Sequence, residues 1–142
     1  MNWLPKNKVL VPVDFSEPSI QAVGTALTLV THPSHLYLVH VLPVLTDYEA
    51  GLVWANTSDD TRQSHAETAL RERLSDAKYA GVQVATAFGD PGHAIVDYAE
   101  SIHADLIVLP SHGRTGLTRL LIGSVAERVV RLAHCPVLVL RG

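Results

Sequence analysis

Five short apolar runs alternate with longer segments of helical spacing, and this alternation leaves few folds open to the chain. The runs are Val9–Val13, Leu36–Val41, Val82–Ala87, Leu106–Leu109 and Val137–Leu140. Four of them are nearly continuous in aliphatic residues, as expected for strands with helices on both faces. The run 82–87 instead alternates apolar and polar side chains, which indicates a more exposed edge strand.

The intervening segments carry apolar residues at the spacing of amphipathic helices. Ser16 and the pair Asp90-Pro91 are typical helix starts, and Gly81 is expected to end the second helix. Strand and helix in regular alternation predict an α/β fold: an open, doubly wound, five-stranded parallel sheet with helices on both faces. The four predicted stripes are Ile20, Val23, Leu27 and Val30; Ala66, Leu70, Leu74 and Ala77; Ile95, Tyr98, Ala99 and Ile102; and Ala126, Val129, Val130 and Ala133.

Composition narrows the class of protein. A chain of 142 residues is the length of one domain, so residues 1–142 are expected to fold as a single unit. A net charge of −3 with 47% hydrophobic residues argues against disorder and against general nucleic-acid binding. The single cysteine, Cys135, excludes an intrachain disulfide framework, and no apolar stretch near the start is long enough for a membrane span. We expect a cytoplasmic protein with neither nucleic acid nor membrane as partner.

The sheet type predicts where a ligand would bind. In an open doubly wound sheet the crevice lies beyond the carboxyl ends of the strands, where the strand order reverses. Pro12, Val13, Asp14 and Phe15 lie at the end of the first strand or just after it, and the loop 111–124 follows the fourth. A helix that begins at Gly123-Ser124 offers unpaired N–H groups and a positive dipole end, which suits phosphate. On spacing alone, however, the glycines of this loop fit a turn-and-cap role equally well.

Several phosphate-binding classes are excluded by their chemistry. A Walker A loop needs a Gly-Lys pair, which the chain lacks. A dinucleotide-binding Rossmann site needs glycines after the first strand, where the residues 14–18 contain none. A receiver domain needs paired acids there, and Asp14 stands alone. No catalytic constellation and no metal-ligating pattern stands out among the eight histidines.

Three segments resemble the universal stress protein family: residues 11–16, 111–124 and 135–140, within a likeness that spans Lys8 to Leu140. The nucleotide-binding members carry a glycine, two residues, a second glycine, nine residues and then Gly-Ser or Gly-Thr. Here the second glycine is Gly113 and the closing pair is Gly123-Ser124, whereas Pro110 replaces the first glycine. The resemblance implies the adenine nucleotide alpha hydrolase-like form of the fold, with strand order 3-2-1-4-5.

The resemblance also implies a site for ATP, or for AMP or ADP, with Mg²⁺ accompanying ATP. Proline has no N–H, so any backbone donation from the position of Pro110 is lost. The residues that would contact adenine and ribose are Pro12, Val13, Asp14, Val41, Leu109, Pro110 and Ser111. The residues that would contact the phosphates are Gly113, Arg114, Gly123, Ser124, Val125 and Ala126.

The family resemblance implies a homodimer, paired through the last strand, Val137 to Leu140, that acts in the cellular stress response. The function expected is binding, with no residue assigned to catalysis. Two alternatives stay open at this point. One is a dimeric interaction or signalling module that works without nucleotide, favoured by Pro110. The other is a slow ATPase or nucleotide-dependent enzyme, although His112-Gly113 is all the chain retains of a His-x-Gly-His phosphate motif.

Overall fold

The computed structural model describes residues 3–45, 58–112 and 122–141, and it contains one five-stranded parallel sheet. The strands lie in the order β3-β2-β1-β4-β5, which confirms the predicted order and the edge position of the third run. Each predicted strand is within one residue of the observed one at either end. The strands are β1 (Val9–Pro12), β2 (Leu36–Leu42), β3 (Gln83–Phe88), β4 (Leu106–Pro110) and β5 (Val137–Leu140).

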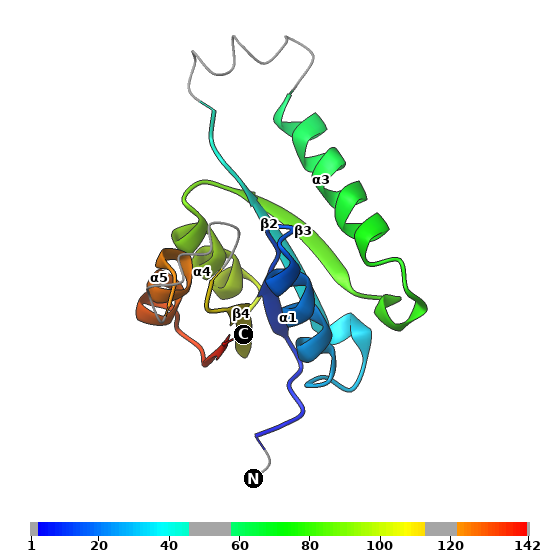
Figure 1. Cartoon of the computed structure of the whole chain (residues 1–142), viewed down its shortest axis with the longest axis vertical. Coiled ribbons are helices and arrows are strands. Elements are labelled where there is room, and N and C mark those ends of the chain that lie inside the picture. The colour runs from blue at the N-terminus through cyan, green and yellow to red at the C-terminus, as the bar shows by residue number, and fades with distance from the viewer. Residues whose placement is uncertain (1–2, 46–57, 113–121, 142) are drawn as a thin grey trace.

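Helices cover both faces of this sheet (Figure 1). On one face lie α1 (Glu17–Leu27) and α3 (Asp59–Arg73), and on the other α4 (Pro91–Ser101) and α5 (Ser124–Leu132). Two short 3₁₀ turns, η1 (Pro33–His35) and η2 (Ala77–Tyr79), precede β2 and β3. Within the described residues, no helix is long and apolar enough to cross a membrane.

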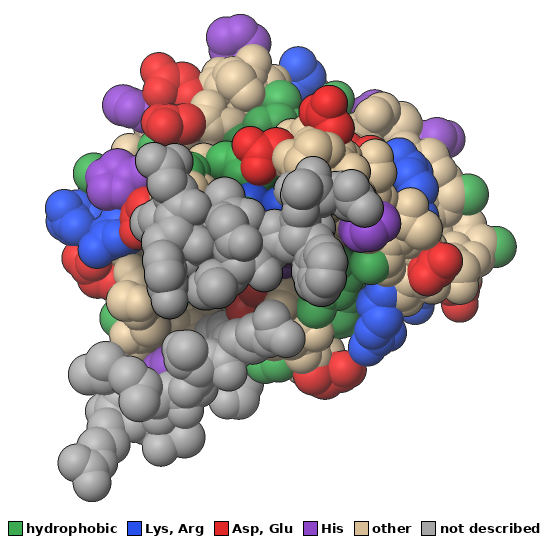
Figure 2. Space-filling model, turned by 90° about the horizontal axis from the view of Figure 1, so that it is seen from above, with side chains coloured by type: hydrophobic (Ala, Val, Ile, Leu, Met, Phe, Trp, Pro, Cys, Tyr) green, Lys and Arg blue, Asp and Glu red, His purple; other side chains and the backbone are tan. Residues whose placement is uncertain are grey.

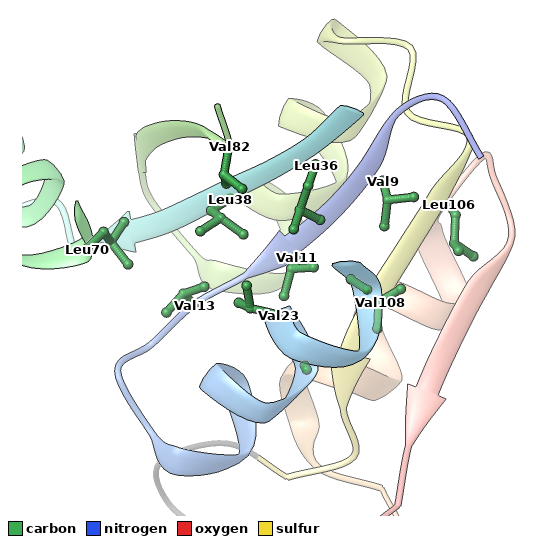
Figure 3. Close-up of a cluster of buried hydrophobic side chains, with 12 residues drawn as sticks. Val9, Val11, Val13, Val23, Leu36, Leu38, Leu70, Val82, Leu106 and Val108 are labelled. Carbon is green, nitrogen blue, oxygen red and sulfur yellow. The ribbon is translucent and has the colours of Figure 1, made fainter. Parts of the chain in front are cut away.

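Alternate residues of each strand supply the two halves of the core. Val9 and Val11 of β1 face α1 and α3, together with side chains of β2 and β4 (Figure 3). Leu10, between them, faces α4 and α5 and packs with Val39 and Leu109. Full burial of an aliphatic side chain stabilises a fold by about 1.5–3 kcal/mol, so both layers contribute strongly. This burial fixes which way every strand residue points, including those at the site described below.

The predicted helix starts are confirmed, and they bring helix N-termini to one end of the sheet. The Ser16 hydroxyl accepts from the N–H of Ser19 and caps α1, and the Asp90 carboxylate accepts from the N–H of His93 and caps α4, with Pro91 at the first helical position. In parallel α/β units each strand runs into its helix at the carboxyl edge. That edge therefore collects the N-termini of α1, α4 and α5.

Three details of the predicted helices are wrong. The second helix, α3, ends at Arg73, and Gly81 lies in the turn just before β3, where its φ of +98° requires glycine. Val130 was placed on the buried stripe of α5 but is 49% exposed. The buried stripe of α1 is Ser19, Ala22, Val23 and Ala26, whereas the predicted Ile20 and Leu27 are half-buried at its margin.

Candidate functional site

Strands β1 and β4 are neighbours in the sheet, with Val9 paired to Leu106 and Leu10 to Ile107, and the chain leaves their carboxyl ends in opposite directions. From β1 it passes to α1 on one face of the sheet, and from β4 toward α5 on the other. A crevice between two such strands is the usual ligand site of an open α/β sheet. Seen from the end toward which β2 runs, acidic, basic and histidine side chains are mixed over the surface (Figure 2).

On the β1 side, Pro12, Val13 and Asp14 turn the chain toward α1. Val13 is buried, its N–H donates to the carbonyl of Val39 at 2.8 Å, and its own carbonyl accepts from the imidazole Nδ1 of His40 at 2.7 Å. The half-buried carboxylate of Asp14 accepts from both the N–H and the hydroxyl of Ser16. Asp14 is therefore fixed by Ser16 at the N-terminus of α1, directly after β1.

On the β4 side, the backbone is paired with β5 within the sheet. Leu109 is buried against α5, and Pro110 pairs in register with Leu140. The N–H of Ser111 donates to the Leu140 carbonyl at 2.8 Å. Ser111 is only 6% exposed, and its hydroxyl lies 3.3 Å from Nδ1 of His112. On the β4 side of the crevice, a ligand can therefore contact side chains but not backbone N–H groups.

The start of α5 is held directly against the end of β4. The N–H of Gly123 donates to the Ser111 carbonyl, and a Cβ at Gly123 would lie 3.0 Å from that oxygen. Gly123 caps α5 without a side-chain hydrogen bond, and the first backbone bond within the helix is from Glu127 to Gly123. The N–H groups of residues 124–126 therefore precede the first of the helix's own donors.

This helix start has the properties of an anion site. Ser124 and Val125 are exposed, while the Ala126 side chain is buried and leaves only its backbone to a ligand. N–H groups that have no backbone partner among the described residues, together with the positive end of the helix dipole, favour a phosphate oxygen there. The neighbouring ring nitrogen of His112, Nε2, is buried without a hydrogen-bond partner in the described part of the chain. The groups present therefore fit a phosphate-bearing ligand.

The structure brings together most of the predicted site. Val41 lies in β2, two residues beyond the Val39 that bonds Val13, and packs on the α4 and α5 side. Gly113 and Arg114 lie outside the described residues. For the rest, the ends of β1, β2 and β4 and the start of α5 converge on one edge of the sheet.

His40 was not predicted as part of this region. Its imidazole donates to Val13 and its ring centroid is 4.8 Å from that of Phe15, whose backbone is left-handed with φ 65°. His40 thereby holds the turn that positions Asp14. The signal in the sequence that could have identified it is a histidine inside an apolar strand, next to the reversal of strand order.

Arg128 of α5 reaches across to α4 and forms an ion pair with Asp90 at 2.9 Å. Hydrogen bonds from the side chain and backbone of His93, together with this guanidinium, lower the pKa of Asp90 to about 2. Among the described residues, no group of three or more histidine, cysteine or acidic side chains could hold a metal ion.

The chain is similar in sequence to known proteins over nearly its whole length. The chain is 37% identical over 139 residues to a universal stress protein, MJ0531, of Methanocaldococcus jannaschii, covering 94% of this chain and 81% of the relative. It is 32% identical to the universal stress protein YxiE of Bacillus subtilis, covering 95% and 99% of the two chains.

Solved structures agree in fold. The universal stress protein UspA from Lactobacillus plantarum is similar with a TM-score of 0.76 at 27% identity, covering 99% and 100% of the two chains. A universal stress protein in complex with cAMP gives 0.69 at 21%, covering 96% and 97%, and an Arabidopsis thaliana family protein with AMP bound gives 0.63 at 19%, covering 95% and 91%. The sequence model of the universal stress protein family matches residues 6–141. The chain therefore belongs to the universal stress protein family.

Proposed function

We propose that the protein binds an adenine nucleotide, ATP, ADP or AMP, in the crevice between β1 and β4. The observation that carries this proposal is the start of α5, which has no side-chain cap and is pressed against the end of β4 at Ser111 and Gly123. Family members of the same fold, solved in complex with cAMP and with AMP, support the same class of ligand.

Each part of the site has a role in this proposal. Adenine and ribose would lie against Pro12, Val13, Asp14 and Val41 on one wall and Leu109, Pro110 and Ser111 on the other. Asp14, fixed by Ser16, would accept a hydrogen bond from a ribose hydroxyl. Gly123, Ser124 and the backbone of Val125 and Ala126 would hold phosphate oxygens, with Gly113 and Arg114 of the same motif beside them. Mg²⁺ would accompany ATP.

The expected affinity follows from these contacts. A charge-assisted hydrogen bond contributes about 1.5–3 kcal/mol, and a favourable helix dipole about 0.3–1 kcal/mol. A dissociation constant of 1 μM corresponds to about −8.2 kcal/mol. Three or four such contacts, with burial of the adenine ring offsetting the entropy of association, correspond to micromolar binding.

The biological setting of the proposal is a cytoplasmic homodimer acting in the stress response, with residues 1–142 as one domain. Two observations support the dimer. Strand β5 lies at the edge of the sheet, where an open row of backbone groups favours pairing with another chain. Its residues are only half-buried within one chain.

A second candidate function is a dimeric signalling module that needs no nucleotide. Three backbone positions on the adenine side favour it. The N–H groups of Val13 and Ser111 already donate within the sheet, and Pro110 has none. Adenine recognition would then depend on side chains and carbonyl groups alone.

Calorimetric titration with ATP, ADP and AMP tests the two candidates. We expect the native protein to bind with micromolar affinity and Gly123→Val to bind at least about 10-fold more weakly, because its side chain would press on the Ser111 carbonyl and separate β4 from α5. Gly24→Ala is the matched control, since a Cβ at Gly24 meets nothing closer than the Tyr79 hydroxyl at 3.8 Å. Binding by neither the native chain nor the variant would favour the nucleotide-free module, and equal affinity in both would remove α5 from the site.

A further inference from the structure

His40 of β2 contacts the turn that follows β1 at two points. Its Nδ1 lies 2.7 Å from the carbonyl oxygen of Val13, and its ring centroid lies 4.8 Å from that of Phe15, with 64° between the two ring planes. The residue between these two contacts is Asp14. One side chain from the neighbouring strand therefore holds the turn on both sides of Asp14.

The contact with Val13 determines the state of one ring nitrogen and the direction of the backbone. A carbonyl oxygen only accepts hydrogen bonds, so Nδ1 of His40 carries a proton and donates it. The N–H of Val13 donates to the carbonyl of Val39, which also belongs to β2, at 2.8 Å. Because both backbone groups of Val13 are hydrogen-bonded to β2, the peptide plane that leads into Asp14 is fixed.

The contact with Phe15 supports a backbone conformation that is unfavourable by itself. Phe15 has a φ of 65°, in the left-handed region that residues other than glycine rarely adopt. Such a conformation persists only where the surroundings hold it, and it is found preferentially at ligand sites. The surroundings here include the His40 ring and the hydrogen bonds from Ser16 to the Asp14 carboxylate. The placement of this carboxylate therefore depends on His40 as well as on Ser16.

We propose that His40 is a positioning residue of the nucleotide site, which holds Asp14 where its carboxylate accepts a ribose hydroxyl and so gives the site its preference for ribose over a sugar without hydroxyl groups. This inference rests on the proposed function, and it deepens it by naming the residue on which ribose recognition depends. His40 acts through Val13 and Phe15, without contacting the ligand itself.

Two variants separate the hydrogen bond of His40 from its ring. His40→Phe keeps a ring beside Phe15 but has no donor for the Val13 carbonyl, whereas His40→Asn carries an amide N–H to about the position of Nδ1 and lacks the ring. Calorimetry with AMP and with 2′,3′-dideoxy-AMP, which keeps the base and the phosphate, measures ribose recognition. We expect the native protein to prefer AMP at least about 10-fold, as for one hydrogen bond to a charged group, and His40→Phe to bind both nucleotides equally. His40→Asn should retain most of the preference, and the affinity for the dideoxy nucleotide should be the same in all three proteins.

A further pair of variants shows whether His40 acts through Asp14. Asp14→Asn removes the charged acceptor and should abolish the preference for AMP. Adding His40→Phe to Asp14→Asn should then cost no further affinity, because two residues that serve one contact are not additive. Losses that add up in the double variant would mean that His40 acts by another route and would overturn the inference.

A spectroscopic measurement reports the ring itself, and the binding data separate the inference from the proposed function. In protein with ¹⁵N-labelled histidine, Nδ1 of His40 should carry a proton with and without AMP, and an unprotonated Nδ1 would overturn the inference. Equal AMP affinity in the native protein and His40→Phe, or no preference for AMP in the native protein, would overturn it and leave nucleotide binding standing. An equal loss of both nucleotides in His40→Phe would also overturn it, since that marks a general structural role. If the native protein binds neither nucleotide, the proposed function fails and the inference with it.

Discussion

At the scale of single residues, one carboxylate joins two helices at the ligand edge. Asp90 caps α4 and accepts hydrogen bonds from His93 and from Arg128 of α5, and its pKa is lowered to about 2. The carboxylate is 45% exposed, so solvent screens these contacts and the net gain is that of a surface ion pair, about 0.2–1 kcal/mol.

The Asp90→Asn variant measures this contribution through its pH dependence. A carboxyl whose pKa falls from 3.8 in the unfolded chain to about 2 on folding adds stability above pH 4, and this stability is lost as the pH falls toward 2. Asparagine keeps the cap and removes the charge. Urea unfolding should show the variant less stable by about 0.2–1 kcal/mol at pH 7 and equal to the native protein near pH 2. A deficit that stays constant from pH 7 to pH 2 would mean that charge is not its cause.

At the scale of secondary-structure elements, the contact between α4 and α5 depends on a missing side chain. A Cβ at Gly92 in the first turn of α4 would lie 2.8 Å from Cβ of Arg128 and 2.6 Å from its Cδ. The Cβ of Arg128 is fixed by the α5 backbone, so the two helices would have to separate. The packing that places the start of α5 at the site therefore requires glycine at position 92.

We expect Gly92→Ala to lower the free energy of unfolding by about 1–3 kcal/mol, the usual cost of overpacking. The matched helix glycine, Gly24 of α1, has room for a Cβ, and Gly24→Ala should raise stability by up to about 1 kcal/mol because alanine is the better helix former. Urea denaturation of the two variants gives both values. A gain in stability at both positions would show that α5 shifts at no cost.

The elements also show how far sequence carries the structure. Strands such as Leu106–Pro110 were predictable because a strand that is buried on both faces is a continuous run of aliphatic residues. Few other segments of the chain contain such a run. The buried faces of helices were predicted less accurately. In α5 the predicted Ala126 and Val129 are buried, but Val130, predicted with them, is 49% exposed, because this helix carries valine on its exposed face as well as on its buried one. The end of α3 was misplaced because η2 fills the stretch before Gly81.

The candidate site was predictable in its location and less so in its chemistry. The order of strands places Asp14 and Ser111 at one edge, and this follows from topology. The pairing of Arg128 with Asp90 and the orientation of His112 depend on how α4, α5 and β4 pack, which no local spacing encodes. For the same reason, the hydrogen bond from the Val13 N–H to the Val39 carbonyl could be identified only from the folded structure.

At the scale of the whole molecule, β5 is an edge strand, and in the part of the chain that the structure describes β4 is its only neighbour in the sheet. Ile107 and Ser111 donate to the carbonyls of Pro136 and Leu140, so these residues turn their backbone groups toward β4. The residues between alternate with them, and Val137 and Val139 direct their N–H and carbonyl groups to the open edge. A second copy of the strand could pair there without disturbing the sheet within one chain.

Val139→Pro tests this pairing in the intact protein. Proline removes the outward N–H but none of the bonds to β4, and it is tolerated on edge strands in that orientation. Two hydrogen bonds are lost per symmetric dimer, so we expect dissociation to become about 10- to 100-fold easier, measured by light scattering and sedimentation across micromolar concentrations. Val139→Thr keeps the N–H and the branched shape and should remain dimeric. A native chain that is monomeric in the micromolar range would contradict the dimer itself. A Val139→Pro chain that stays fully dimeric would instead place the interface elsewhere, and the exposed Val125 and Val130 of α5 would be the next residues to change.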